Sequence, residues 1–252
     1  MSTSTSGTID FAVIGGTGLY KLAELDNVQT HAVDTPYGTP SAPVRVGGFG
    51  PYRIAFMARH GEGHAMPPHR INYRANLWAL KSIGATRVVA VNSVGGITEA
   101  WGPRVIGVPD QIIDYTHGRT VSLWDVEGEA LHVDFGEPYT HELRHALLAA
   151  AAEAEVPVVD GGCYGATQGP RLETKAEIER LRRDGCDLVG MTGMPEAALA
   201  RELGLDYACL AIVANWAAGR APTEEVITLD DVLANMAAAT EPLPALLRAL
   251  RF

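Results

Sequence analysis

The chain has 252 residues, of which 47% are hydrophobic and 20% charged, enough to bury one sizeable core without disulfides or a structural metal. Its 30 acidic and 20 basic residues give a formal net charge of -10, which disfavours binding to nucleic acid or to an anionic membrane surface. No apolar run approaches the roughly 20 residues that a membrane-spanning helix needs, and the N-terminal residues lack the features of a secretion signal. We therefore expect a single domain over residues 1–252, located in the cytoplasm, with residues 1–8 disordered.

The predicted elements alternate between strands and helices. Apolar runs predict strands at residues 9–14, 44–46, 53–58, 87–92, 158–160, 162–166, 187–191 and 208–214. Helical spacing with end signals predicts helices at residues 72–83, 140–154, 174–183 and 195–203, and one that opens at a capping box beginning with Thr228. This alternation predicts an α/β domain with a twisted, mixed central sheet flanked by helices.

Glycine is unusually frequent, with 27 residues in 252, more than a tenth of the chain against an average of about 7%. Many of these glycines follow predicted strands, where the backbone of a protein can approach a ligand closely. The three cysteines lie far apart and show neither Cys-x-x-Cys nor zinc-ligand spacing, so we expect reduced packing residues.

The first glycine cluster is Gly-Gly-Thr-Gly at residues 15–18, directly after a predicted strand. Consecutive main-chain N–H groups in such a loop can converge on an anion, and Thr17 adds a hydroxyl donor. A dinucleotide-binding fingerprint would require glycine where Lys21 stands, and no P-loop lysine follows. A tight structural turn explains this segment equally well.

The second cluster is Arg-His-Gly-Glu-Gly-His at residues 59–64. His60 and His64 superficially match a zinc-binding helix, but Gly61 and Gly63 favour a loop, so we expect no metal. Arg59 beside His60 suits an oxyanion better, because a guanidinium group can hold phosphate with two parallel hydrogen bonds. The structural alternative is a solvated arginine and a histidine in a turn.

Two further segments, residues 92–96 and 190–196, again combine a hydroxyl with glycines at a strand end. The Gly-x-Ser-x-Gly pattern of a nucleophilic serine is absent, and no covalent nucleophile is evident. If Thr17, Ser93 and Thr192 converge from their separate strand-end loops on Arg59 and His60, they form a site for inorganic phosphate or a phosphoryl group.

Six motifs in this order resemble the trimeric purine nucleoside phosphorylases, in particular the branch of the methylthioadenosine phosphorylases. They are Gly15-Gly-Thr-Gly18, Asp34-Thr-Pro-Tyr-Gly38, Arg59-His60-Gly61, Asn72-Tyr73 with Ala75-Asn76-x-Trp78-Ala79-Leu80, Gly169-Pro170-Arg171 and Gly190-Met191-Thr192-x-x-Pro195-Glu196. The resemblance implies a nucleoside phosphorylase fold and a pentosyltransferase activity with inorganic phosphate as co-substrate. It also implies no organic cofactor or metal and a homotrimer, with a hexamer as the alternative.

The resemblance assigns a phosphate site and a ribose contact. The phosphate site falls on Thr17, Arg59, His60, Ser93, the main-chain N–H of Val94, and Thr192. Ser93 stands where the family usually has threonine, which keeps the hydroxyl. The main chain of Met191 would face the ribose hydroxyls.

At the purine end the chain departs from its branch, because the usual Asp-x-Asp pair is replaced by Asn215 and Ala217. An amide N–H₂ suits the 6-oxo group of hypoxanthine, whereas the 6-amino group of adenine needs an acceptor. Glu173 favours the same base, because it can accept the N1 proton of a 6-oxopurine. Leu172 replaces the aromatic residue of the 6-oxopurine enzymes. The alternative for Glu173 is a charge favoured near a helix N-terminus.

At the 5′ end Leu229 stands where the 6-oxopurine enzymes have a histidine for the 5′-hydroxyl. Val232 and Met236 share its helical face, and three apolar side chains suit a methylthio group. Simple core packing explains such a stripe equally well.

Together these features predict phosphorolysis of S-methyl-5′-thioinosine to hypoxanthine and 5-methylthioribose 1-phosphate, with His60 and Asn215 as the catalytic residues. The alternatives within the family are a general 6-oxopurine nucleoside phosphorylase and a methylthioadenosine phosphorylase. Two alternatives lie outside the family. One is a dinucleotide-binding oxidoreductase, because Asp34 follows the first glycine cluster at a suitable distance, and the other is an inactive nucleoside-binding module.

Overall fold

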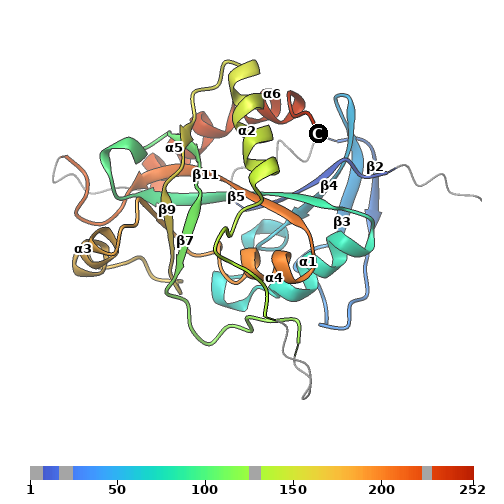
Figure 1. Ribbon diagram of the computed structural model, residues 1–252, viewed down its shortest axis with the longest axis horizontal. Helices are drawn as coiled ribbons and strands as arrows, with labels where there is room; N and C mark the ends of the chain where they lie inside the picture. The colour runs from blue at the N-terminus through green and yellow to red at the C-terminus, as the bar shows by residue number, and fades with distance from the viewer. Residues whose placement is uncertain (1–7, 17–24, 125–131, 223–228) are drawn as a thin grey trace, which may run out of the picture.

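The structure is a computed structural model that describes residues 8–16, 25–124, 132–222 and 229–252. These residues form a mixed 11-stranded sheet with helices on both faces (Figure 1). The strands are β1 (Phe11–Gly15), β2 (Asp26–His31), β3 (Val44–Phe49), β4 (Tyr52–Ala58), β5 (Arg87–Gly96), β6 (Ile106–Val108), β7 (Gln111–Asp114), β8 (Val159–Asp160), β9 (Cys163–Ala166), β10 (Leu188–Gly190) and β11 (Asp206–Trp216). The helices are α1 (Tyr73–Ser82), α2 (His141–Glu153), α3 (Lys175–Arg183), α4 (Glu196–Glu202), α5 (Leu229–Thr240) and α6 (Leu243–Arg248).

The sheet separates two hydrophobic cores. Alternate side chains of β1 enter opposite cores, with Ile14 on one side and Val13 on the other. Helices α1 and α4 cover the first face, and α2, α5 and α6 cover the second, as Figure 1 shows. Because β1 and the first part of β5 are buried on both faces, they read in the sequence as continuous apolar runs. The predicted α/β class is confirmed.

Local signals explain where the helices begin and end. The side chain of Asn72 accepts a hydrogen bond from the Ala75 main chain at the start of α1. Thr174 and Glu177 form a reciprocal capping box at the start of α3. The capping box predicted at Thr228 lies outside the described residues, as does the predicted disorder of residues 1–7. None of the helices in the described ranges is both long and apolar enough to cross a membrane.

The strand prediction missed β2, β6 and β7. The β2 segment is polar and its first five residues are exposed, so it carries no apolar alternation. β6 is only three residues long. β5, in contrast, runs four residues beyond the predicted end at residue 92, because β11 pairs with it as far as Gly96. Ser93 is therefore part of a strand, where a loop was expected.

A gap along one edge of β5 positions the site. β1 pairs with this edge as far as Val91, and β10 pairs with it again from Gly95. β11 fills the opposite edge. Between the two partners, residues 92–94 have no strand neighbour on the first edge among the described residues. The carboxyl ends of β1 and β4 lie at this gap, where ligands commonly bind in open α/β sheets.

Candidate active site

A cavity of about 260 Å³ lies at the gap in β5. Most of the predicted site residues line it, namely Arg59, His60, Ser93, Val94, Leu172, Glu173, Met191, Thr192, Asn215, Val232 and Met236. Residues that are far apart in the sequence thus meet in one place, as the phosphate, purine and 5′ predictions together require. Thr17 and the side chain of Leu229 lie outside the described residues.

Ala217 is the exception among the described predictions, because it does not line the cavity. A β-bulge shifts the register of β11 between Val213 and Asn215. Asn215 lines the cavity, whereas Ala217 is buried with Val189 and Ile97 in a separate small core. Its main-chain N–H donates to the Gly96 carbonyl, which continues the strand pairing.

Arg59 follows β4 and is almost completely buried. Its Nε and Nη2 donate to the two carboxylate oxygens of Glu196 at 2.7 and 2.8 Å. Nη1 also donates to the Val91 carbonyl at 2.9 Å, and Nη2 to that of Ile14 at 3.2 Å. Burial alone would lower the pKa of Arg59, but the charge and hydrogen bonds of Glu196 raise it overall, so the guanidinium stays charged.

These contacts correct the expected role of Arg59. The Nε and Nη2 edge of the guanidinium, which could hold phosphate with two parallel hydrogen bonds, is occupied by Glu196. Among the described residues, one N–H of Nη1 has no acceptor and is the donor left for a ligand. Arg59 therefore offers an anion a buried positive charge and a single hydrogen bond.

His60 is neutral at physiological pH. Its Nδ1 lies 2.8 Å from the Met66 carbonyl, which can only accept, so Nδ1 carries the proton and Nε2 is an acceptor. Burial lowers the pKa of His60 to about 4, and the positive charge of Arg59 adds to the decrease although the bond to Met66 opposes it. The ring covers Gly16, where a Cβ would lie 3.0 Å from the imidazole. A protonated phosphate oxygen is a suitable donor for Nε2.

Thr192 has its hydroxyl oriented by Asn92. The Asn92 amide donates to the Thr192 oxygen at 2.8 Å, and both residues are buried. Since the oxygen accepts this hydrogen bond, the hydroxyl can donate its own hydrogen to another acceptor. Thr192 lines the cavity, so it can donate to an anion there.

Ser93 and Met236 meet at the other side of the cavity. The Ser93 hydroxyl lies 3.3 Å from the Met236 sulfur, a weak acceptor. Met236 on α5 is buried and Val232, one turn earlier, is half-buried. The apolar face of α5 therefore has both roles considered from the sequence: it packs on the core and it lines the cavity.

The proposed purine end combines one carboxylate and one amide. Glu173 accepts a hydrogen bond at 2.6 Å from the Thr167 hydroxyl on one oxygen, which leaves its second oxygen available. Asn215 donates one amide hydrogen to the Trp216 carbonyl at 2.7 Å and keeps the other. Leu172 is 74% exposed beside them. Glu173 offers a ligand edge one carboxylate oxygen as an acceptor, and Asn215 offers its second amide hydrogen as a donor together with its amide oxygen.

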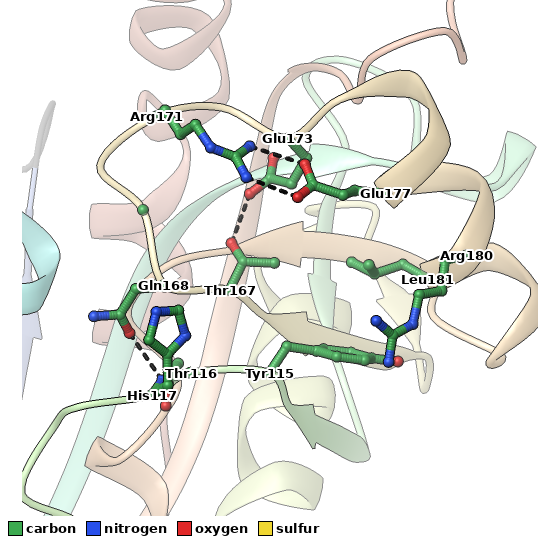
Figure 2. A pocket seen from close by; sticks show the side chains of 11 residues that line it. Tyr115, Thr116, His117, Thr167, Gln168, Arg171, Glu173, Glu177, Arg180 and Leu181 are labelled. Carbon is green, nitrogen blue, oxygen red and sulfur yellow. Dashed lines mark hydrogen bonds and ion pairs between the residues drawn. The ribbon is translucent and has the colours of Figure 1, made fainter.

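A larger hollow of about 550 Å³ adjoins the cavity and shares Glu173 with it. Figure 2 shows Glu173 hydrogen-bonded to Thr167, while Arg171 and Glu177 pair with each other across the same hollow. That ion pair is solvent-exposed and contributes little to stability. None of the predicted phosphate-binding residues that the structure describes lines the larger hollow.

Several residues of the cavity were not predicted. His64 and Pro68 line it, and the rings of His60 and His64 stack with centroids 4.1 Å apart. Asn92 and Glu196 lie behind it and hold Thr192 and Arg59. His64, Asn92 and Glu196 lie in segments that the sequence analysis singled out, whereas Pro68 lies in none of them. The partner of Arg59 is 137 residues away in the chain, and no local pattern reveals such a pair.

Some glycines near the site make room for protein atoms. A Cβ at Gly190 would lie 2.2 Å from the hydroxyl of Tyr164, and one at Gly193 would lie 2.2 Å from its ring. Tyr164 is completely buried, so these two glycines accommodate its side chain. Packing against Tyr164 is therefore a second role of these glycines, in addition to the lining of the cavity by Gly190.

The chain matches the model of the phosphorylase superfamily over residues 10–250. It is 64% identical over 96% of its length to a Xanthomonas campestris pv. campestris protein named "Probable S-methyl-5'-thioinosine phosphorylase", of which it covers 97%. It is 46% identical over 82% of its length to the 6-oxopurine nucleoside phosphorylase of Pyrococcus furiosus, of which it covers 80%.

Among solved structures, a methylthioadenosine phosphorylase of Schistosoma mansoni in complex with adenine superposes with a TM-score of 0.90. It is 31% identical, and the match covers 96% of this chain and 90% of that one. These matches confirm the family resemblance that the six motifs indicated. The chain belongs to the phosphorylase superfamily and has the fold of its nucleoside phosphorylases, which are pentosyltransferases.

Proposed function

We propose that the protein cleaves S-methyl-5′-thioinosine with inorganic phosphate to give hypoxanthine and 5-methylthioribose 1-phosphate. The observation that carries this proposal is the composition of one cavity. It combines anion-binding groups, an amide and a carboxylate at one end, and apolar α5 side chains beside Ser93. The relative from Xanthomonas campestris supports the same substrate.

In the proposed reaction, phosphate binds beside Arg59, His60 and Thr192. A phosphate oxygen attacks the anomeric carbon from the face opposite the base, the bond to the base nitrogen breaks, and the configuration inverts. The bound dianion stabilises the positive charge that develops on the sugar. Because phosphate is the nucleophile and the site supplies proximity and electrostatics, no nucleophilic side chain is needed.

The protein groups have distinct roles in this scheme. Nε2 of neutral His60 accepts a hydrogen bond from the protonated oxygen of the phosphate dianion. This bond orients the other phosphate oxygens for attack. The free N–H of Asn215 donates to the purine as negative charge builds on it. Glu173 accepts the N1 proton of a 6-oxopurine. The proton of the phosphate ends on the departing hypoxanthine, which leaves the sugar phosphate as a dianion.

The 5′ substituent separates two candidate substrates. A 5′-hydroxyl placed against Val232 and Met236 would lose its hydrogen bonds to water, at a cost of about 1–3 kcal/mol, whereas a methylthio group would not. We therefore expect methylthioinosine to exceed inosine in kcat/KM by about 10- to 100-fold. A general 6-oxopurine nucleoside phosphorylase is the second candidate, favoured by the Pyrococcus furiosus relative and by Glu173 and Asn215, which do not contact the 5′ group.

The test compares kcat/KM for methylthioinosine, inosine and methylthioadenosine in phosphate buffer, with phosphate-free buffer as the control. The proposal expects phosphate-dependent release of hypoxanthine and the order methylthioinosine, inosine, methylthioadenosine. Equal rates with inosine would favour the second candidate. A preference for methylthioadenosine would contradict the roles of Asn215 and Glu173.

The assembly and the location are also proposals. We expect a homotrimer, with a hexamer as the alternative, and a cytoplasmic location. Small-molecule nucleoside and phosphate are the expected partners, and neither a metal nor an organic cofactor is expected to be needed. Light scattering coupled to gel filtration measures the assembly, and activity after dialysis against a chelator tests the expectation about metal.

A further inference from the structure

Arg119 lies beside the cavity without lining it, and its guanidinium contacts two loops that do. Nη1 donates to the main-chain carbonyls of Met191 and Met194 at 2.8 and 2.6 Å. Nη2 donates to the carbonyls of Thr167 and Gln168 at 3.2 and 2.8 Å, and Nε donates to the side chain of Gln168 at 3.2 Å. One rigid group therefore joins residues 167–168 to residues 191–194.

Three of the residues that Arg119 contacts, Met191, Thr167 and Tyr73, lead to groups in the cavity. Met191 lines the cavity, and Thr192 follows it in the loop. Thr167, held through its carbonyl, donates its hydroxyl to Glu173 at 2.6 Å. Nη1 also donates at 3.2 Å to the hydroxyl of Tyr73, which in turn donates to the carbonyl of Pro68, another lining residue. Three walls of the cavity thus depend on the position of Arg119.

The acceptors around Arg119 distinguish it from an ordinary ion-paired arginine. In the described part of the chain its acceptors are carbonyl, amide and hydroxyl oxygens, with no carboxylate within salt-bridge distance. A planar guanidinium with five fixed N–H donors sets the distance and angle between the segments that it bridges. A lysine has one nitrogen and cannot reach both loops with the same geometry.

We propose that Arg119 is a positioning residue that holds the Thr167–Glu173 wall and the Met191–Thr192 wall at the spacing that a nucleoside and phosphate require together. The inference rests on the proposed function, since it assigns these walls to the purine and to the ribose and phosphate. A shift of one wall against the other would misplace both substrates, and misplacement by about 1 Å can reduce a rate by about 100-fold.

The experiment compares Arg119→Met with Arg144→Met. Arg144 serves as the control because it also is half-buried and donates to two main-chain carbonyls, those of Pro109 and Val108, both at 3.0 Å. It differs from Arg119 in one respect, since it also pairs with the exposed carboxylate of Asp160 at 2.6 Å. It lines neither the cavity nor the larger hollow. Both variants are expected to lower Tm. Only Arg119→Met should raise KM for nucleoside and for phosphate, each by about 10-fold or more, and reduce kcat.

Two further measurements separate positioning from stability. Millimolar guanidinium should partly restore the activity of Arg119→Ala, because this variant leaves an empty guanidinium position between the walls. Arg144→Ala should keep its activity, and guanidinium should leave that activity unchanged. Arg119→Lys should recover Tm more fully than it recovers KM. The proposal is overturned if Arg119→Met has native KM values, or if Arg144→Met raises them equally.

A failure of the proposed function would look different. In that case the native chain would release no hypoxanthine with phosphate. The phosphate-dependent rise in Tm then still tests Arg119, because it measures binding without turnover. Loss of this rise in Arg119→Met, with the rise retained in Arg144→Met, supports the positioning role, and an unchanged rise in both variants contradicts it.

Discussion

His60 carries its proton on Nδ1, and its pKa of about 4 lies below the ordinary value of 6.5 because the ring is buried. The unfolded chain therefore takes up a proton at this residue before the folded protein does. Its contribution to stability is complete above pH 6.5 and is lost as the pH falls from 6.5 towards 4. The full shift corresponds to about 3 kcal/mol.

We predict that the free energy of unfolding falls more steeply between pH 7.5 and pH 4.5 in the native protein than in His60→Gln. The difference should be about 2–3 kcal/mol, and urea unfolding at the two pH values measures it. Between pH 7.5 and pH 8.5 the two proteins should show the same slope. Parallel curves down to pH 4.5 would mean that His60 is protonated as easily in the folded state as in the unfolded chain.

The side chain of Asn215 decides the base preference in the proposed reaction. We predict that Asn215→Asp lowers kcat/KM for methylthioinosine and raises it for methylthioadenosine, with the ratio changing by about 100-fold. A carboxylate repels the 6-oxo group and accepts from the 6-amino group, a difference of about 1–3 kcal/mol. Steady-state assays with both substrates measure the ratio. Asn215→Ala is the control, since it should slow both substrates without reversing the order.

Glu196 neutralises Arg59 in the protein interior, where both side chains are almost fully buried. We predict that Glu196→Ala destabilises the fold by about 3–5 kcal/mol, because it leaves a buried guanidinium without its counter-charge. Tyr207→Phe is a milder comparison, because it removes only the hydroxyl that donates to Glu196 at 2.9 Å, worth about 2 kcal/mol. Urea unfolding of both variants checks the order, and equal effects would argue against the charge explanation.

At the scale of elements, α3 begins directly after Glu173 and is held by its capping box. Thr174 accepts from the Glu177 main chain at 3.1 Å, and Glu177 accepts from the Thr174 main chain at 2.7 Å. We predict that Thr174→Ala lowers the free energy of unfolding by about 1 kcal/mol, as loss of an N-cap usually does. Thr174→Ser keeps the hydroxyl and should remain close to the native value in the same denaturation experiment.

The elements also show what the sequence could predict. The longer buried strands and the capped helices were predictable, because their apolar runs and end signals are local, whereas the three-residue β6 is buried but too short to show such a run. β2 was not, because edge strands with exposed polar residues lack alternation. The continuation of β5 through Ser93 depends on pairing with β11, more than 100 residues later, and glycines at its end suggested a loop instead.

The residues of the site also fall into those that the sequence could predict and those that it could not. Arg59, His60 and Thr192 lie in motifs, Glu173 and Asn215 were identified by their positions relative to the family, and the structure brings all five to one cavity. The hydrogen-bond partner of Arg59 was not predictable, because Glu196 meets its Nε and Nη2 only once the chain has folded. Arg119 carried no signal either, since its acceptors are main-chain carbonyls, which any sequence provides.

At the scale of the whole molecule, a chain of net charge -10 is proposed to bind an anion. The cavity offers this anion hydroxyl groups and, within the described part of the chain, the one free N–H of Arg59, whose charge is balanced by Glu196. We predict that phosphate raises Tm, with about 2.7 kcal/mol of added stability at 100 times its Kd. NAD should have no effect in the same thermal scan. A rise with NAD and none with phosphate would favour the dinucleotide-binding alternative.

The packing of Tyr164 against Gly190 and Gly193 has a consequence for how this protein can diverge. Any side chain at either glycine displaces the tyrosine, whose hydroxyl contacts the main chain of Thr192. The three positions therefore constrain one another: a homologue with alanine at position 190 or 193 must carry a smaller residue at 164. Such paired substitutions at positions 164, 190 and 193 would record the divergence of this wall, although the side chain of Tyr164 does not line the cavity.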